Sequence, residues 1–324
     1  MKKVVVLGAG MVGGAMAADL CTEYEVVVVD ADRGRGEALA GRHRLTFQQA
    51  DLMQPAAIAA AVAPADLVIG AVPGFMGFQV LAAVIAAGKN VVDISFFPED
   101  PFALDELARQ AGVTAVVDCG VAPGLGNLIL GYHYGRMAVD SFECMVGGLP
   151  TARPYPWQYK APFSPIDVIE EYTRPARLVV NGEIVVKPAL SDAELVTLAP
   201  VGELEAFNTD GLRTLLRTVS VPHMRERTLR YPGHIDLIRV LQASGFFDAT
   251  PRRINGAEVQ PLAVTAALLF EQWRLTPGEP EFTIMRVQIR GRENDQPRAY
   301  SYHLYDETDA VSGTSSMART TGYT

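Results

Sequence analysis

Three glycines and one carboxylate near the start of the chain stand at a distinctive spacing. The segment VVVLGAGMVGG carries Gly8, Gly10 and Gly13, and Asp30 ends the next apolar run, EVVVVD. Gly8 permits a tight turn, Gly10 has no Cβ to block a pyrophosphate, and Gly13 lets the following helix pack close to the strand. The pattern predicts a dinucleotide site at a helix N-terminus. The alternative is a glycine-rich packing turn.

Asp30 also bears on the choice of nucleotide. A carboxylate at this position accepts hydrogen bonds from a free ribose diol and repels a 2′-phosphate, so we expect NAD in preference to NADP. Arg33 and Arg35 follow closely and weaken that preference. Beside Asp30 and the three glycines, the residues expected to contact the cofactor are Met11, Val12, Asp51, Val72 and Pro73.

Two further carboxylates are expected at the ends of neighbouring strands. Asp93 ends the strand in NVVDIS, and Asp118 ends the strand in TAVVDCG. Because ligands bind beyond the carboxyl ends of parallel strands, both would point toward the reactive end of the dinucleotide. Either could take a proton from a substrate amine before hydride leaves. For each one alone, the alternative is a helix cap or a local hydrogen bond to the backbone.

Polar clusters in the second half of the chain could hold a substrate. FNTDGLRTLL brings Thr209, Asp210 and Arg213 into one turn, and TLRYPGHIDLI places Arg230 and His234 around a Pro-Gly bend. An arginine could bind a substrate carboxylate through two hydrogen bonds, or could form a surface ion pair. His234 could shuttle a proton, or could be structural. No histidine has a carboxylate or cysteine at ligand spacing, so we expect no metal.

The overall composition narrows the classes of function. With 324 residues, 49% of them hydrophobic, the chain is too long for one core, and two domains are expected. A net charge of −9 argues against nucleic acid or an anionic membrane as a partner, and favours a small molecule. Three cysteines without a CxxC pair fit a reducing cytoplasm. We find neither a signal peptide nor an apolar stretch of about 20 residues that could span a bilayer.

The elements needed to position these residues alternate over the first 120 residues. Short continuous apolar strands separated by helices predict a doubly wound parallel sheet of the Rossmann type. The expected strands are 4–8, 25–30, 44–51, 66–73, 90–95 and 114–120, and the expected helices are 13–22, 34–41, 55–63, 77–88 and 101–111.

The second half has a different texture and predicts an α+β domain with a mostly antiparallel sheet. RLVVNGEIVVKP is a hairpin whose Asn181-Gly182 pair suits a type I′ turn. Helical periodicity occurs at 233–244 and 261–274, and strand-like alternation at 282–291 and 298–307. We predict a Rossmann domain at 1–125, joined by the C-terminal segment 308–324, and a substrate-binding and dimerisation domain at 126–307.

Motifs in both halves resemble one known family. They are the glycine turn, DCGVAPGLGN at 118–127, VGGLP at 146–150, FNTDGLRTLL at 207–216 and TLRYPGH at 228–234. Together they resemble the saccharopine dehydrogenase superfamily, and most closely its lysine 6-dehydrogenase branch, over nearly the whole chain. The resemblance implies an NAD(P)-binding domain, an inserted mixed domain, a C-terminal helix that returns to the first domain, and a homodimer.

Departures from the family pattern bear on the substrate. The saccharopine-forming reductases carry an aspartate in a G-L-D-P-G turn and an arginine where the ribose phosphate is bound, whereas this chain has Ala122 and Asp30. Both differences point away from an NADP-linked reductase of that type. The lysine dehydrogenases resemble this chain in the alanine and in an aspartate where Asp93 stands. Their FHTSGGTSTL-like stretch is replaced here, which adds Asp210 and Arg213 and leaves the exact substrate open.

We therefore predict an NAD-dependent dehydrogenase that oxidatively deaminates the side-chain amine of a basic amino acid, with L-lysine as first choice. Asp93 or Asp118 would accept a proton from the ammonium, hydride would pass to the nicotinamide, and water would hydrolyse the imine. Arg213 would bind the α-carboxylate. The alternatives are a dehydrogenase of a secondary amine, such as saccharopine or a carboxylated polyamine, and a non-catalytic NAD-binding protein.

Overall fold

The computed structural model describes residues 1–163, 165–276 and 278–324, which form two compact units. The first unit contains Met1–Asn127 and Met317–Thr324, and the second contains Leu128–Ser316. The domains predicted from the sequence, 1–125 with 308–324 and 126–307, place the divisions slightly earlier in the chain at both points.

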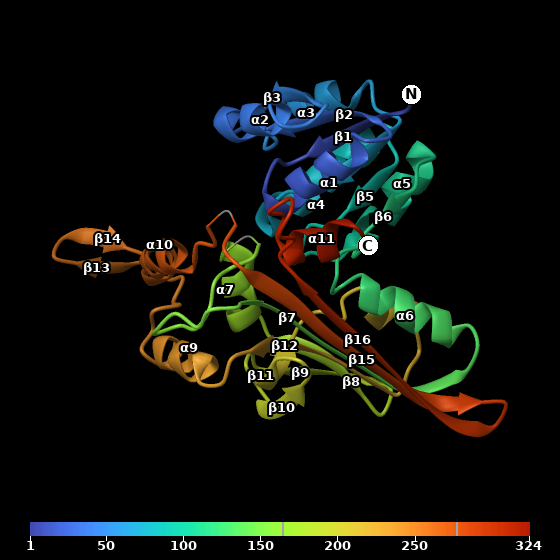
Figure 1. Ribbon diagram of the computed structural model, residues 1–324, viewed down its shortest axis with the longest axis vertical. Helices are drawn as coiled ribbons and strands as arrows, with labels where there is room; N and C mark the ends of the chain where they lie inside the picture. The colour runs from blue at the N-terminus through green and yellow to red at the C-terminus, as the bar shows by residue number, and fades with distance from the viewer. Residues whose placement is uncertain (164, 277) are drawn as a thin grey trace. The chain divides into compact units, whose positions relative to one another are not determined.

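Six parallel strands form the sheet of the first unit (Figure 1). Their spatial order is β3-β2-β1-β4-β5-β6. The chain adds β2 and β3 on one side of β1 and then adds β4, β5 and β6 on the other side, so the order reverses between β1 and β4. The predicted doubly wound sheet is confirmed, and its ligand-binding edge is expected at the carboxyl ends of β1 and β4. The strands are β1 (Lys3–Leu7), β2 (Glu25–Asp30), β3 (Thr46–Gln49), β4 (Leu67–Gly70), β5 (Val91–Asp93) and β6 (Ala115–Val116).

Apolar side chains cover both faces of this sheet, which explains its uninterrupted apolar strands. Val5 and Leu7 of β1 belong to one core cluster with residues of α3 and α4, and Val4 and Val6 belong to another with residues of α1. Each buried Val or Leu contributes about 1.5–3 kcal/mol, so these short runs become the central strands. The helices are α1 (Met11–Leu20), α2 (Arg33–Ala40), α3 (Pro55–Val62), α4 (Gly74–Ala86) and α5 (Asp105–Ala111).

Several elements of the first unit differ in their bounds from the sequence-based expectation, and three of these differences have a clear physical reason. Helix α4 begins at Gly74 instead of 77, because Pro73 precedes its first turn with an extended backbone. The segment expected as one helix at 101–111 is a 3₁₀ turn (Pro101–Leu104) followed by α5, because the Asp100 carboxylate accepts from the Phe102 amide and starts the turn there. The sixth strand is shortened to Ala115–Val116, since Asp118 has a φ of 54° that turns the chain out of the sheet.

The C-terminal helix α11 (Ser316–Gly322) ends within the first unit. A Cβ at Gly322 would lie 3.0 Å from Met16 Cγ, so the end of α11 packs on α1. The last residues of the chain therefore add to the core of the unit that begins it.

A mixed sheet of eight strands forms the second unit. Its order is β10-β11-β12-β7-β15-β16, with β8 beside β12 and β9 beside β8. β12 and β7 run parallel, and the other pairs described run antiparallel, which confirms the predicted α+β domain. The strands are β7 (Ala138–Pro150), β8 (Ala176–Val180), β9 (Glu183–Lys187), β10 (Glu194–Leu198), β11 (Gly202–Thr209), β12 (His223–Arg230), β15 (Glu281–Glu293) and β16 (Gln296–Glu307).

Helices pack beside this sheet around a large aromatic core. Trp273 lies at its centre, with ring centroids 5.4 Å from Tyr159 and 6.1 Å from Tyr172. In the predicted hairpin, Asn181 and Gly182 both have positive φ, as a type I′ turn requires. The helices are α6 (Leu125–Tyr134), which begins in the first unit, α7 (Pro165–Thr173), α8 (Leu215–Thr218), α9 (His234–Ala243) and α10 (Pro261–Trp273).

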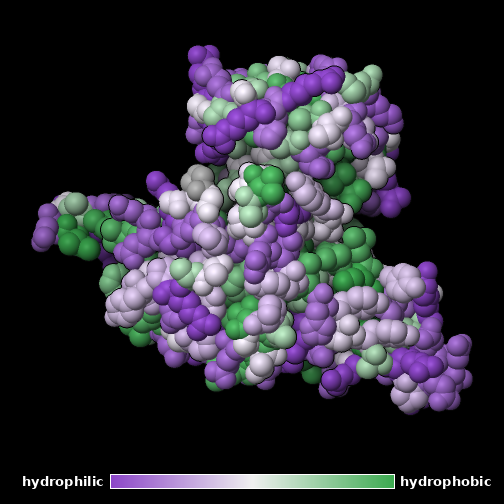
Figure 2. Space-filling model, in the orientation of Figure 1, coloured by the Kyte–Doolittle hydropathy of each residue, from purple (hydrophilic) through white to green (hydrophobic). Residues whose placement is uncertain are grey.

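A short hairpin, β13 (Arg252–Ile254) and β14 (Ala257–Val259), forms an arm with α10. Figure 2 shows apolar surface on this arm, to which Ile254 and Leu268 contribute exposed side chains. Among the described residues, no helix has both the length and the apolar character needed to cross a bilayer.

Candidate functional site

The glycine-rich turn after β1 has the geometry that its spacing predicts. Gly8 has a φ of +109°, and a Cβ there would lie 2.4 Å from the Ala71 carbonyl oxygen. A Cβ at Gly13 would lie 2.3 Å from the Gly8 carbonyl oxygen, whereas a Cβ at Gly10 would meet no protein atom within 4 Å. Gly8 and Gly13 are thus required by the fold itself, and the open side of Gly10 fits the passage of a pyrophosphate.

The first turn of α1 follows Gly10 directly. Met11 and Val12 are its first two residues, and Gly10 has the extended backbone of an N-cap without a side chain to cap the helix. The amides of this turn have no intrahelical acceptors, so they are free to donate to phosphate oxygens. The residues present therefore fit a bound dinucleotide.

Asp30 ties the glycine turn to the end of β2. Its Oδ2 accepts from the Ala9 amide at 2.7 Å, and its Oδ1 accepts from the Asp32 amide at 2.8 Å. The half-exposed Arg35 brings Nη1 to 3.9 Å from Asp30 Oδ2. The carboxylate that was expected to bind ribose thus has a structural role as well, and a cation stands beside it.

The other expected cofactor residues lie after β3 and β4. Asp51 is exposed, and its carboxylate accepts from the Met53 amide at 2.9 Å in the turn before α3. Val72 is buried, and Pro73 immediately precedes α4. Of these residues, Val72 and Pro73 belong to the loop after β4, whose Ala71 contacts Gly8 as described above.

Asp93 and Asp118 are both buried, and both lie near the same thiol. Asp93 ends β5 with 1% of its surface exposed, and Asp118 is 7% exposed. Cys119 Sγ donates to the Asp93 carbonyl oxygen at 3.2 Å. Burial raises the pKa of the Cys119 thiol to about 12, with further contributions from the negative charges of Asp93 and Asp118. Asp93 and Asp118 therefore lie in one neighbourhood. Asp93 ends β5 as expected, whereas Asp118 lies beyond the end of β6, because its positive φ turns the chain out of the sheet.

Two of these candidates have unusual backbone conformations. Asp118 has a φ of 54° and Arg213 a φ of 40°, and both side chains are buried. A positive φ costs a residue with a side chain energy that the surrounding structure must offset, and such residues cluster at functional sites. This observation favours a functional role for Asp118 and Arg213 over a purely structural one.

Asp210 is engaged in an ion pair within the second unit. Its two carboxylate oxygens accept from Arg177 Nε and Nη2, each at 2.8 Å, and Oδ1 also accepts from the Arg177 amide. Thr209 accepts a hydrogen bond from the Thr228 hydroxyl at 3.1 Å. These contacts favour a structural role for Asp210, and no motif in the sequence indicated Arg177 as its partner.

Arg230 and His234 belong to a buried polar network. Arg230 is 2% exposed; its Nε donates to the Tyr172 hydroxyl at 2.9 Å, and its Nη2 donates to Glu171 Oε2 at 2.5 Å. His234 Nδ1 donates to the Trp157 carbonyl oxygen at 2.8 Å, so Nε2 accepts from the Tyr172 hydroxyl at 2.9 Å. Burial and the charge of Arg230 lower the pKa of His234 to about 3. A neutral histidine with both nitrogens engaged favours the structural alternative.

Sequence reasoning missed the partners in this network. Glu171 and Tyr172 lie on α7, which is remote in the chain from Arg230, and neither belongs to a recognisable motif. The only signal was the pair Glu170-Glu171 at the edge of an amphipathic helix, where one carboxylate faces inward.

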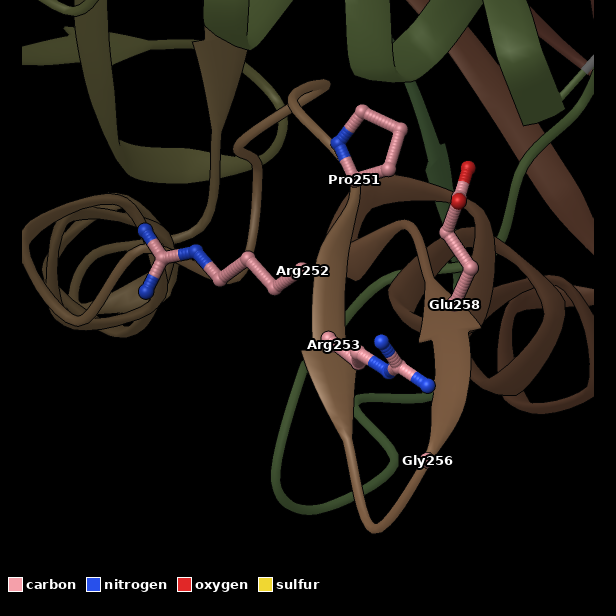
Figure 3. Close-up of a pocket in the computed structure, with 5 residues that line it drawn as sticks. All are labelled: Pro251, Arg252, Arg253, Gly256 and Glu258. Carbon is pink, nitrogen blue, oxygen red and sulfur yellow. The ribbon is translucent and has the colours of Figure 1, made fainter.

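A hollow of about 450 Å³ lies beside the β13–β14 arm (Figure 3). It is lined by Pro251, Arg252, Arg253, Gly256 and Glu258, and the two arginine side chains point in different directions. Arg252 also pairs with Asp248 at 2.7 Å. None of the candidate residues lines this hollow, so we do not assign the chemistry to it. Among the described residues, no group of three His, Cys, Asp or Glu side chains could hold a metal ion.

The parallel sheet, with its reversal between β1 and β4 and its glycine turn, defines a Rossmann-type dinucleotide-binding protein with a second α+β unit. Family models extend this assignment. The saccharopine dehydrogenase NADP binding domain matches residues 4–116, and the saccharopine dehydrogenase C-terminal domain matches residues 120–324. The chain belongs to the saccharopine dehydrogenase family, and its cofactor class is a nicotinamide dinucleotide.

Named relatives cover different shares of the chain. Saccharopine dehydrogenase [NADP(+), L-glutamate-forming] of Pyricularia oryzae is 28% identical over 76% of this chain and 58% of its own length. The mitochondrial alpha-aminoadipic semialdehyde synthase of Mus musculus is 28% identical over 72% of this chain and 27% of its own length. The chain thus spans little more than half of the first of these relatives and about a quarter of the second. Carboxyaminopropylagmatine dehydrogenase of Synechocystis is 22% identical over 99% of this chain and 86% of its own length.

A solved structure supports the fold. Apo saccharopine dehydrogenase (L-Glu forming) from Saccharomyces cerevisiae superposes with a TM-score of 0.77, covering 100% of this chain and 89% of that one at 19% identity. At this identity, the similarity concerns the fold alone.

Proposed function

We propose that this protein is an oxidoreductase that uses a nicotinamide dinucleotide to oxidise the C–N bond of a secondary amine with amino-acid character. The pair of buried carboxylates, Asp93 and Asp118, on the carboxyl edge of the first unit's sheet carries the proposal, because amine oxidation needs a proton acceptor there. Family membership supports the class of reaction.

The choice of a secondary amine rests on the relatives. Saccharopine and carboxyaminopropylagmatine, the compounds in their names, both have a nitrogen between two carbon arms. This supports the alternative considered in the sequence analysis over the first choice, deamination of lysine. Ala122 and the aspartate at 93 remain the sequence features that favour lysine, and lysine is therefore an arm of the test.

The proposed reaction removes a proton from the substrate, then a hydride, and ends with hydrolysis of the C–N bond. Asp93 or Asp118 takes a proton from the substrate ammonium, because an ammonium has no lone pair to stabilise the cation left when hydride departs. The bound dinucleotide supplies the acceptor for the hydride released from the adjacent carbon. Water then adds to the substrate iminium, and the C–N bond breaks to give a carbonyl compound and an amine. The low solvent exposure of both carboxylates keeps bulk water from competing for the proton.

Arg213 is the proposed ligand of a substrate carboxylate. It is buried, and its strained backbone indicates that the surrounding structure fixes its position. A guanidinium binds a carboxylate through two parallel hydrogen bonds, which a lysine ammonium does not reproduce. Arg230 is the weaker candidate, since Glu171, Tyr172 and Tyr159 already surround its guanidinium.

For the cofactor we propose NADP. The matching family domain is described as NADP-binding, and one relative is named as NADP(+)-dependent. Within the chain, Arg35 stands 3.9 Å from Asp30, and Arg33 is exposed on the same turn. A 2′-phosphate would compete with their exposed ion pairs, Arg35 with Asp32 and Arg33 with Glu37. The two backbone amides donating to the Asp30 carboxylate offset part of its repulsion of that phosphate.

The test measures reduced-nicotinamide absorbance with saccharopine, a carboxyalkylated polyamine and lysine, each supplied with NADP and with NAD. Reduction with a secondary amine supports the proposal. Reduction with lysine alone, accompanied by ammonia release, would replace it with the deaminase, and no reduction with any amine despite dinucleotide binding would reject both. Asp93→Asn or Asp118→Asn should lower turnover by roughly two to four orders of magnitude for the residue that takes the proton.

A further inference from the structure

Two glycines, one at the end of β4 and one in the first turn of α4, are required for a reason other than backbone freedom. Neither Gly70 nor Gly77 has a positive φ. A Cβ at Gly70 would lie 1.9 Å from Asp93 Oδ2, and a Cβ at Gly77 would lie 2.6 Å from the Cβ of Ser95. Both glycines therefore make room for side chains of the segment that ends β5.

Ser95 contacts both oxygens of the Asp93 carboxylate. The Ser95 amide donates to Oδ1 at 2.9 Å, and the Ser95 hydroxyl donates to Oδ2 at 3.3 Å. Asp93 is 1% exposed and Ser95 is 5% exposed, so bulk water does not replace these donors.

Gly70 and Ser95 constrain the same oxygen atom. Gly70 leaves space for Oδ2 over the end of β4, and the Ser95 hydroxyl holds Oδ2 in that space. Gly77 lets α4 approach Ser95 closely, which limits movement of Ser95 itself. Strand β4, helix α4 and the end of β5 together define one orientation of the carboxylate.

We infer that Ser95 is a positioning residue for Asp93, and that Gly70 and Gly77 are kept small to accommodate this pair. The inference rests on the proposed function in one respect: Asp93 is taken as the proton acceptor. Ser95 need not contact the substrate. Loss of the hydroxyl removes one constraint on Oδ2 while the amide bond to Oδ1 remains, and misplacement of a catalytic group by about 1 Å can cost roughly a hundredfold in rate.

A double-mutant cycle tests the inference. Ser95→Ala should lower kcat roughly ten- to a hundredfold and leave KM nearly unchanged, because the substrate-binding groups are untouched. In the Asp93→Asn background, the same substitution should cause little further loss, since a residue that acts through Asp93 has nothing left to position. Equal losses in both backgrounds, or wild-type kcat in Ser95→Ala, would overturn the inference.

A matched control is Cys119→Ala. It removes a half-buried donor to the Asp93 carbonyl oxygen, 3.2 Å away, without touching the carboxylate. Its kcat should stay closer to wild type than that of Ser95→Ala. A loss as large as that of Ser95→Ala would show that any disturbance next to Asp93 suffices, and would remove the specific role of the hydroxyl.

A crystal structure of Ser95→Ala separates failure of this inference from failure of the proposed function. We expect the Asp93 carboxylate to turn away from the space over Gly70. If the wild-type protein oxidises no amine but the carboxylate turns in the variant, the positioning contact stands and the proposed function fails. If Asp93→Asn abolishes turnover while the carboxylate keeps its orientation in Ser95→Ala, the function stands and the inference fails.

Discussion

Replacing Gly10 by alanine should impair dinucleotide binding without disrupting the fold. Gly10 has a φ of −68° and a ψ of −174°, an extended conformation that alanine adopts freely. The new Cβ would meet no protein atom within 4 Å. Because Gly10 is the N-cap of α1, the cost to the free energy of unfolding should be about 1 kcal/mol or less.

The Cβ would instead occupy the path of the pyrophosphate. Forcing an extra methyl group into a filled space costs about 1–3 kcal/mol, which weakens binding roughly 5- to 150-fold. At a dinucleotide concentration of about 100 times the wild-type Kd, binding stabilises the folded protein by about 2.7 kcal/mol. A hundredfold weaker Kd reduces that stabilisation to about 0.4 kcal/mol.

Chemical unfolding of the Gly10→Ala variant, with and without NADP, measures both the change in stability and the change in dinucleotide binding. Gly14→Ala is the control on the same helix, since its Cβ would make ordinary contact with Leu39 at 3.7 Å and should leave binding intact. Gly13→Ala should lower stability without ligand, because its Cβ would lie 2.3 Å from the Gly8 carbonyl oxygen. Full ligand-induced stabilisation of the Gly10→Ala variant would refute this placement of the pyrophosphate.

Three further predictions concern single residues. The pKa of His234 is lowered from 6.5 to about 3, so below about pH 6.5 the unfolded chain binds a proton that the folded protein does not bind. The free energy of unfolding should therefore fall from pH 6.5 toward pH 3, by up to about 1.4 kcal/mol per pH unit. Unfolding measured at several pH values should show a shallower slope for His234→Gln. Glu171→Gln removes the carboxylate charge paired with the buried Arg230 and should cost roughly 3 kcal/mol in urea unfolding; a loss below about 1 kcal/mol would contradict the network. Arg35→Ala should lower kcat/KM with NADP roughly tenfold, which corresponds to about 1.5 kcal/mol, and should leave kcat/KM with NAD nearly unchanged. An equal change with both nucleotides would count against a contact with the 2′-phosphate.

Local patterns predicted much of the dinucleotide-binding unit. The run EVVVVD became β2 with the bounds expected, because four consecutive valines are stable only where both faces of a strand are buried. The spacing of Gly8, Gly10 and Gly13 predicted one glycine for a positive φ, one with an open side and one for close packing, and the structure has these three environments. The sequence predicted that Asp93 and Asp118 lie near each other, and both interact with the Cys119 thiol, although Asp118 lies beyond the end of β6.

Long-range partners could not be predicted in this way. Asp210 pairs with Arg177, 33 positions away, and Arg230 pairs with Glu171, 59 positions away. The first pair depends on the pairing of β8 with β12, and the second depends on the packing of α7 against the aromatic core. Neither arrangement leaves a periodic signal in the chain, so the sequence left Asp210 and Arg230 open as substrate ligands.

The sequence by itself determined the alternation of strands and helices in the first unit, the sign of the net charge and the chemistry of the glycine turn. These follow from side-chain size, hydropathy and spacing, which act over a few residues. Only the tertiary structure decided which charged groups are already paired, that His234 is neutral, and that Ser95 donates to both oxygens of the Asp93 carboxylate. Hydrogen bonding and burial depend on groups from distant segments, and only the folded chain brings those segments together.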